Sequence, residues 1–190
     1  GKLLDISCGS NFTCFLDENG KLGCVGGDID FAPKNSPRRK IKAEDLVKYG
    51  IDPLSKNENQ DFSSKIFKNL KAGDSQICAQ GKNDDIVYCM GANLWGMGES
   101  INQKALDYAL DLHTVMIIAD DGRLSMAGSQ LAFHEAKNLA SLAGLKFRNV
   151  VTSFSGNTAF FTGPNNRYDD GTTLPENSLV IPSFPKTMIY

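Results

Sequence analysis

Residues 9–26 read GSNFTCFLDENGKLGCVG, and they decide the fold because the chain repeats their pattern. The pattern returns over residues 73–91 as GDSQICAQGKNDDIVYCMG, and more faintly over residues 110–128 as LDLHTVMIIADDGRLSMAG. Each copy has an apolar run, a polar turn rich in Asp, Asn and Gly, a second apolar run and a closing glycine. Two apolar runs around such a turn predict a β-hairpin. Self-similarity every few tens of residues predicts a propeller, a solenoid or an array.

The overall composition is that of a folded protein. With 41% hydrophobic and 22% charged residues among 190, the chain can bury a core as one domain or two small ones. Its formal net charge of −2 gives no whole-chain field that would attract nucleic acid or an anionic membrane. No apolar run approaches the roughly 20 residues of a membrane span. We therefore expect neither a nucleic-acid partner nor a membrane span.

Four of the five cysteines occupy equivalent places in two repeats. Cys14 and Cys24 lie on the two arms of the first hairpin, and Cys78 and Cys89 lie on those of the second. Opposed residues of antiparallel strands bring their Cβ atoms close enough for a disulfide. We expect both pairs to be bonded, which indicates an extracytoplasmic compartment, whether secreted, periplasmic or lumenal. The alternative is reduced cysteines packed in the core of a cytoplasmic protein.

Two further positions belong to the same pattern. In the third repeat we align the apolar pair Val115 and Met126 with the cysteines. Cys8 is the odd cysteine, and three states are open for it: buried, free, or bonded between chains.

The spacing of the repeats gives the organisation of the chain. We expect a single repeat domain with units at about residues 1–28, 65–98, 105–128 and 147–173, an insertion at 29–64 and a tail at 174–190. Apolar residues at helical intervals predict one short helix after the third repeat, over residues 129–143. Within the insertion, residues 44–49 are compatible with a helical turn.

The repeated residues resemble the regulator-of-chromosome-condensation repeat family, whose members form seven-bladed β-propellers. The family pattern runs Gly-x-x-His-Thr-Cys-Ala-Leu, a turn with Gly, then Cys-Trp-Gly-x-Asn. The resemblance implies a mainly β fold of antiparallel blades, and three or four repeats imply a partial propeller. It departs from the family at the Trp position, which holds Val25, Met90 and Ala127. The matching residues are Gly9, Thr13, Cys14, Leu16, Gly20, Cys24, Gly26, Gly73, Cys78, Ala79, Cys89, Gly91, Asn93, Gly96, Gly98, His113, Thr114, Gly122 and Gly128.

An unclosed propeller exposes strand edges that invite pairing. We therefore expect a protein partner, or self-association, to complete the propeller. The basic cluster Arg38, Arg39 and Lys40 could bind an anionic partner or be part of a solvated loop. The lone tryptophan, Trp95, could be a surface anchor or pack between units. The apolar tail offers a third surface. The candidate partner-binding residues are Arg38, Arg39, Lys40, Trp95, Phe184, Ile189 and Tyr190.

No catalytic motif is visible in the sequence: there is no Gly-x-Ser-x-Gly, no His-Glu-x-x-His and no phosphate loop. The aspartates at positions 28, 30, 169 and 170 are better interpreted as turn residues than as a cation site. We expect no enzyme activity, no cofactor and no metal. The sequence favours a non-catalytic binding or assembly module of an extracytoplasmic protein, which engages protein partners through its propeller-like loops and open edges. The alternative, implied by the resemblance, is an intracellular guanine-nucleotide exchange factor-like regulator of a small GTPase.

Overall fold

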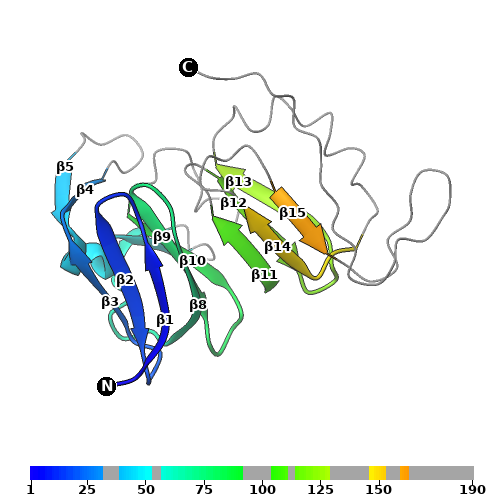
Figure 1. Ribbon diagram of the computed structural model, residues 1–190, viewed down its shortest axis with the longest axis horizontal. Coiled ribbons are helices and arrows are strands. Elements are labelled where there is room, and N and C mark those ends of the chain that lie inside the picture. Colours follow the sequence, from blue (N-terminus) through cyan, green and yellow to red (C-terminus); the bar gives the residue numbers. More distant parts are fainter. Residues whose placement is uncertain are drawn as a thin grey trace, which may run out of the picture.

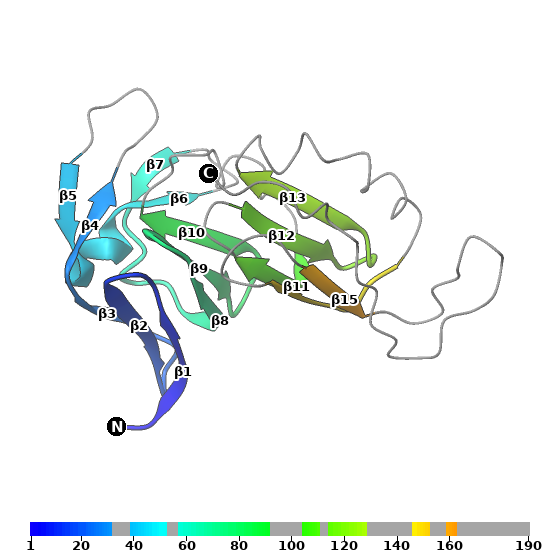
Figure 2. The same ribbon diagram turned by 45° about the horizontal axis from the view of Figure 1, so that its top comes forward.

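Antiparallel sheets follow one another along the chain, as the blades of a propeller do (Figure 1). This computed structural model describes residues 1–31, 39–52, 57–91, 104–110, 114–128, 146–152 and 159–162. Sheets of successive repeats lie side by side in sequence order, and Figure 2 shows the second sheet between the first and the third. The predicted mainly β, partial-propeller fold is confirmed.

The first blade contains β1 (Leu3–Cys8), β2 (Phe12–Asp17) and β3 (Leu22–Gly26), in that order. The β2–β3 turn forms because the Asp17 carboxylate accepts the backbone N–H groups of Asn19 and Lys21, each at 2.8 Å. Gly20 completes this turn at φ 78°, a left-handed conformation that favours glycine. A Cβ on Gly20 would also lie 2.6 Å from the carbonyl oxygen of Phe67 in the next blade. The turn residue therefore permits close approach of the second blade.

The second blade has five strands, in the order β7-β6-β10-β9-β8. Three of them are the predicted repeat: β8 (Phe67–Ala72), β9 (Gln76–Gly81) and β10 (Val87–Gly91). The other two, β6 (Gly50–Asp52) and β7 (Asn57–Gln60), come from the segment that the sequence analysis placed in an insertion. The rest of that segment forms the ribbon of β4 (Asp28–Phe31) and β5 (Arg39–Lys42), followed by the 3-10 helix η1 (Ala43–Lys48).

The third blade contains β11 (Ala105–Leu110), β12 (Thr114–Ala119) and β13 (Leu124–Gly128), and a fourth sheet pairs β14 (Asn149–Thr152) with β15 (Ala159–Thr162). The register of the third blade corrects one expectation from the sequence. Met116, not Val115, lies opposite Met126, while Val115 lies opposite Ala127. The closing glycine sets this register, because Gly128 pairs with the first residue of β12 as Gly26 pairs with that of β2. The alignment from sequence was one residue out, which places a side chain on the wrong face.

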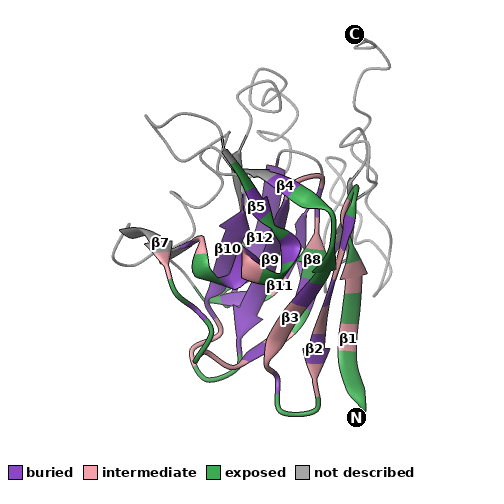
Figure 3. Cartoon of the chain, turned by 90° about the vertical axis from the view of Figure 1, so that its left-hand side faces the viewer, coloured by how far each residue is buried: buried purple, intermediate pink, exposed green. Residues whose placement is uncertain are grey.

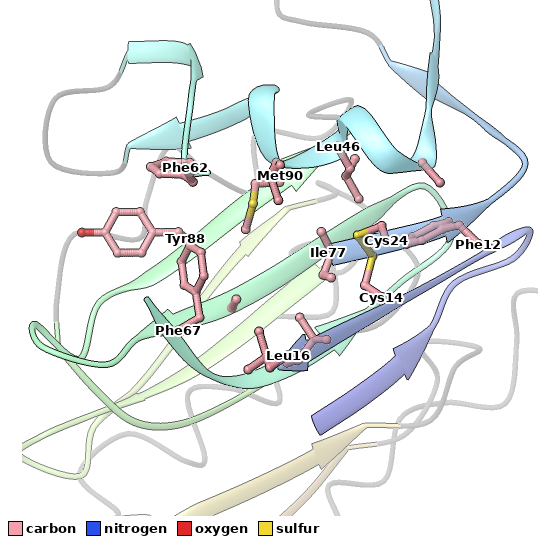
Figure 4. Packing of buried hydrophobic residues seen from close by; sticks show 14 of the residues in the cluster. Phe12, Cys14, Leu16, Cys24, Leu46, Phe62, Phe67, Ile77, Tyr88 and Met90 are labelled. Carbon is pink, nitrogen blue, oxygen red and sulfur yellow. A yellow bond between two sulfur atoms is a disulfide. The ribbon is translucent and has the colours of Figure 1, made fainter. Parts of the chain in front are cut away.

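Two apolar clusters hold the blades together, one on each face of the second blade. Strand β2 alternates buried and half-buried residues, whereas β9 and β10 are buried at every position (Figure 3). The larger cluster joins the first blade, η1 and one face of the second blade, and Figure 4 shows Cys14, Cys24, Ile77 and Leu46 within it. The second cluster joins the other face to the third blade, through residues such as Tyr108. The middle blade is therefore covered on both sides.

The helix predicted over residues 129–143 lies outside the described residues. So do the predicted ends of the second and fourth units, at residues 98 and 173, and the tail at 174–190. The described part of the chain contains one helix, η1, close to the turn predicted at residues 44–49.

Candidate functional site

The register of the first two strands lets corresponding positions of the four blades be matched. The pairs that occupy the same place are Ile6–Phe15, Leu70–Ala79, Tyr108–Ile117 and Val150–Phe161. Ile6 thus corresponds to Leu70, Tyr108 and Val150. Those three residues are 2%, 0% and 3% exposed, whereas Ile6 is 58% exposed. The position is a core position in every blade except the first.

Two more apolar residues of the first blade show the same contrast. Leu3 is 49% exposed, although its counterparts Phe67, Ala105 and Phe147 are all buried. Val25 is 58% exposed, and its counterpart Met90 is 2% exposed. Isolated apolar residues on a surface are ordinary, but a row of displaced core positions indicates an uncovered face.

Leu4 and Leu106 are also exposed, but for another reason. They occupy the same place in their blades, beside the β-bulge of the leading strand, where the fourth blade has the exposed Arg148. This position faces solvent in each of these blades. The exposure of Leu4 therefore says nothing about the face between blades, and Leu4 serves below as a control position.

The direction of the uncovered face follows from the side chains that point the opposite way. Asp5 Oδ2 accepts the backbone N–H of Leu70 at 2.7 Å, and Ser7 Oγ accepts that of Ala72 at 2.9 Å. Residues alternate along a strand, so Asp5 and Ser7 face the second blade and Ile6 and Cys8 face away from it. We call the outward side the open face, made of Leu3, Ile6, Cys8, Thr13, Phe15 and Val25. No described strand covers it.

Cys8 lies on the open face and is free and exposed. The Thr13 hydroxyl donates to its Sγ at 3.5 Å, which fixes the two side chains beside each other. The Phe15 ring lies over Gly23 of the neighbouring strand, where a Cβ would lie 2.6 Å from it. The open face is therefore mostly apolar and carries one thiol.

The four remaining cysteines form two disulfides, and each lies on the face of its blade that corresponds to the side opposite the open face. Cys14 and Cys24 lie opposite each other with an S–S distance of 2.06 Å, and Cys78 and Cys89 with one of 2.01 Å. The first pair belongs to the cluster between the first and second blades, and the second pair to the cluster between the second and third. Each disulfide thus faces the following blade, while the open face is the side of the first blade without one.

A charged cluster closes the turn of the second blade. The Asp84 carboxylate accepts the Tyr88 hydroxyl at 2.7 Å and the Lys65 ammonium at 2.9 Å, and that ammonium lies 3.8 Å from the centre of the Tyr88 ring. Partial burial opposes ionisation of Asp84, but hydrogen bonds from Lys65, Tyr88 and the backbone of Ile86 outweigh it and lower its pKa. Burial raises the pKa of Tyr88. All the polar groups have partners within the cluster, so its role is to hold the turn.

The third blade is joined to the second by a fully buried tyrosine. The Tyr108 hydroxyl lies 2.6 Å from the carbonyl oxygen of Asn69 and 2.8 Å from that of Cys78, so its one proton is shared between them. Burial raises the pKa of Tyr108 well above its usual value, and the nearby charges of Asp5 and Asp107 add to the effect. Gln80, 1% exposed, donates to the carbonyl oxygen of Ala105 at 2.5 Å across the same junction.

The residues predicted from sequence to bind partners are not brought together in the described part of the chain. Lys40 is exposed on β5, and Arg39 is described only as a backbone position on that strand. Arg38, Trp95, Phe184, Ile189 and Tyr190 lie outside the described residues. The open face was missed, although aligning the repeats shows an apolar residue at Ile6 where later blades also have one.

The described residues form neither a metal site nor a membrane-spanning helix. Within the described part of the chain, no group of three or more His, Cys, Asp and Glu side chains is placed to hold a metal ion. Among the same residues, no helix is long and apolar enough to cross a membrane.

Comparison with known sequences bears on the first blade. Residues 4–28 match the family profile described as "Regulator of chromosome condensation (RCC1) repeat". The chain carries an RCC1-type repeat. The matched RCC1-type segment covers β1, β2 and β3, the blade that bears the open face. A search of curated protein sequences finds no significant match.

Comparison with solved structures shows the same fold at low sequence identity. The CRINKLY WD40 ectodomain of the Arabidopsis thaliana receptor kinase ACR4 matches with a TM-score of 0.55 and 15% identity, over 87% of this chain and 48% of that one. The ectodomain of the Physcomitrella patens receptor kinase CR4 matches with 0.52 and 14%, over 92% and 36%. Prp20p of Saccharomyces cerevisiae, described with its binding to Gsp1p and histones, matches with 0.51 and 14%, over 99% and 52%. The chain thus spans about half the length of these proteins, or less.

Proposed function

We propose that this chain is a non-catalytic binding or assembly module of an extracytoplasmic protein, and that it engages a protein partner through the open face of the first blade. The observation that carries the proposal is the exposure of Leu3, Ile6 and Val25 at positions that are buried in the following blades. Burying each such side chain fully is worth about 1.5–3 kcal/mol. A partner that covers all three gains this free energy together.

The chemistry of the open face suits a protein rather than a small ligand. It is a sheet surface that carries the aliphatic side chains of Leu3, Ile6 and Val25 together with the Phe15 ring, and contiguous apolar patches of this kind mark protein interfaces. The strands already pair with one another within the β1–β2–β3 sheet, so this face offers a partner mainly apolar contact.

The two disulfides support the extracytoplasmic part of the proposal. Both lie in buried clusters and close short loops within one hairpin each, and such bonds persist in oxidising compartments. Two of the proteins with a similar fold are receptor ectodomains. These observations favour a compartment outside the reducing cytosol.

A second function is favoured by one comparison. Prp20p, which shares the fold, is described by its binding to Gsp1p and histones. This chain would then resemble an exchange factor acting on a small GTPase. A nucleotide-release assay with fluorescent GDP bound to a small GTPase distinguishes the two, because the assembly module is expected to leave the release rate unchanged.

The proposal is tested by placing a photo-crosslinking amino acid at position 25, on the open face, in the protein expressed in its source cells. The matched control carries the same amino acid at exposed position 18, in the β2–β3 turn. We expect a defined protein adduct from position 25 that is absent from position 18 and is lost in Ile6→Asp. Equal labelling from both positions, or no protein adduct from position 25, would contradict the proposal.

A further inference from the structure

One backbone contact recurs at every junction between described blades. The carbonyl oxygen of the left-handed turn residue accepts the N–H of the first residue of the next blade's leading strand or, for β14, of the residue two positions before it. The three cases are Gly20 with Phe67 at 2.8 Å, Asp85 with Ala105 at 3.0 Å, and Gly122 with Phe147 at 2.9 Å. Leu3 holds the corresponding place in the first blade, and its N–H is therefore the group that a preceding turn would meet.

A second contact uses a side chain of the leading strand. Asp5 accepts the N–H of Leu70 in the second blade at 2.7 Å, and Asp107 accepts the N–H of Val150 in the fourth at 2.9 Å. The two aspartates occupy the same place in their blades, and so do their two donors. At the junction between them, Asn69 and Tyr108 hold these places, but the contact differs: the Tyr108 hydroxyl donates to the backbone carbonyl oxygen of Asn69, whose side-chain amide donates to Gln80 of its own blade. This position of the leading strand thus contacts the next blade at all three junctions.

The donor position of this contact recurs at one end of the described array, and the acceptor position recurs at the other. At the first blade, the N–H of Ile6 corresponds to the donors Leu70 and Val150, but it donates to the side chain of its own neighbour Asp5 at 2.9 Å. At the fourth sheet, Asn149 corresponds to Asp5 and Asp107, and it is exposed. The chain therefore presents a donor with an apolar face at one end and the matching amide at the other.

We propose that the open face of the first blade receives the fourth sheet of a second copy of this chain, head to tail, with the Asn149 amide oxygen accepting the N–H of Ile6. This deepens the proposed function and rests on it. The side chains of Leu3, Ile6 and Val25 then reach the burial of their counterparts in the later blades.

A head-to-tail dimer and a face-to-face dimer use different surfaces. A face-to-face dimer joins the open face of one copy to the open face of the other, so Asn149 takes no part. A head-to-tail dimer needs the open face of one copy and Asn149 of the other at each junction. Damage at either place breaks both junctions of a homodimer, whereas a mixture of the two variants keeps one junction intact and places the two altered residues together at the other.

The experiment measures association of the 190-residue chain by sedimentation equilibrium, from micromolar to near-millimolar concentration. The variants are Ile6→Asp and Asn149→Lys, and the controls are Leu4→Asp and Arg148→Ala, which alter neighbouring exposed positions outside the contact. We expect the wild type and both controls to dimerise. Ile6→Asp should weaken association by about thirtyfold at each junction, the size of an interface hot spot, and so by about a thousandfold in a homodimer that loses both junctions. Mixing Ile6→Asp with Asn149→Lys should restore it, because the introduced charges are opposite.

The alkylation rate of Cys8 gives a second measurement that is independent of sedimentation. Cys8 is the free cysteine and lies on the open face, so its alkylation by iodoacetamide should slow as the concentration of wild type rises. The slowing should be absent in Ile6→Asp and retained in Leu4→Asp. A far-UV circular dichroism spectrum and a urea midpoint like those of the wild type show that each variant is folded.

Three results would overturn the inference. They are a wild type that stays monomeric, an Asn149→Lys variant that dimerises as the wild type does, and a mixture of variants that fails to associate. None of them removes the proposed function, which would survive if position 25 still crosslinks to a different protein. The loss of that crosslink would remove both.

Discussion

Removing the hydroxyl of Tyr108 tests how the second and third blades are held together. This side chain is fully buried, and its hydroxyl is within hydrogen-bond distance of two carbonyl oxygens, those of Asn69 and Cys78. In Tyr108→Phe the ring remains, so little packing is lost. The junction, however, loses the hydrogen bond that this hydroxyl donates, and one hydrogen bond contributes about 0.5–1.5 kcal/mol to stability.

We expect the free energy of unfolding of Tyr108→Phe to fall by about 1 kcal/mol, the middle of that range. For a chain of this size, such a loss lowers the melting temperature by about 2–4 °C. Urea unfolding followed by far-UV circular dichroism gives the free energy, and an unchanged slope shows that the unfolded state is the same. Tyr88→Phe is the control, because Asp84 keeps Lys65 and the backbone of Ile86 as partners.

The alkaline limb of the stability curve gives an independent reading of the same residue. The pKa of Tyr108 is raised in the folded chain, so its stabilising contribution is complete below the unfolded value of about 10 and is lost as pH rises towards the folded pKa. Tyr108→Phe should be less sensitive to pH above about 10 than the wild type. A loss below about 0.5 kcal/mol, with an unchanged alkaline limb, would refute the assigned role of the hydroxyl.

Three further predictions concern the turns and the cysteines. Asp84→Asn should make stability less sensitive to acid, because the lowered pKa of Asp84 gives a stabilising contribution that is present above its unfolded pKa and lost as pH falls. Urea midpoints at acid and neutral pH measure this, and an equal fall of the midpoint in the variant and the wild type would contradict it. Gly20→Ala should destabilise by more than about 1 kcal/mol, since φ is 78° and the new Cβ meets the Phe67 carbonyl; a neutral effect in urea unfolding would oppose this reading. Intact mass without reductant should show one alkylated cysteine, Cys8, and five after reduction and unfolding; more than one before reduction would argue against the disulfides.

The hairpins could be predicted from sequence because their signals are local. The turn at Asp17 to Gly20 and the apolar arms on either side specify a hairpin without reference to the rest of the chain. The opposed placement of Cys14 and Cys24 follows from the length of that hairpin. In the third repeat the same reasoning failed by one residue at Val115, because without cysteines only the closing glycine, Gly128, marks the register.

Features that depend on distant segments could not be predicted in this way. Strands β6 and β7 are short and lack a run of apolar residues, and they become strands because the edge of β10 is available to pair with β6. The open face was likewise hidden, because Ile6 is as apolar as its buried counterpart Leu70. Its exposure reflects which blades surround it, and that is a property of the assembled array.

Each disulfide is confined to a single hairpin, with a sequence separation of 10 for Cys14–Cys24 and 11 for Cys78–Cys89. No described disulfide bridges two blades, so adjacent blades are tethered covalently only by the connecting polypeptide. Under mechanical tension applied to its ends, the array should therefore separate at the junctions first, while the cysteine-closed hairpins stay folded back on themselves. Each crosslink withholds about 35 Å of contour length from extension, as ten residues span at most about 3.3–3.6 Å each. Pulling single molecules before and after reduction would show these two increments of length as separate gains.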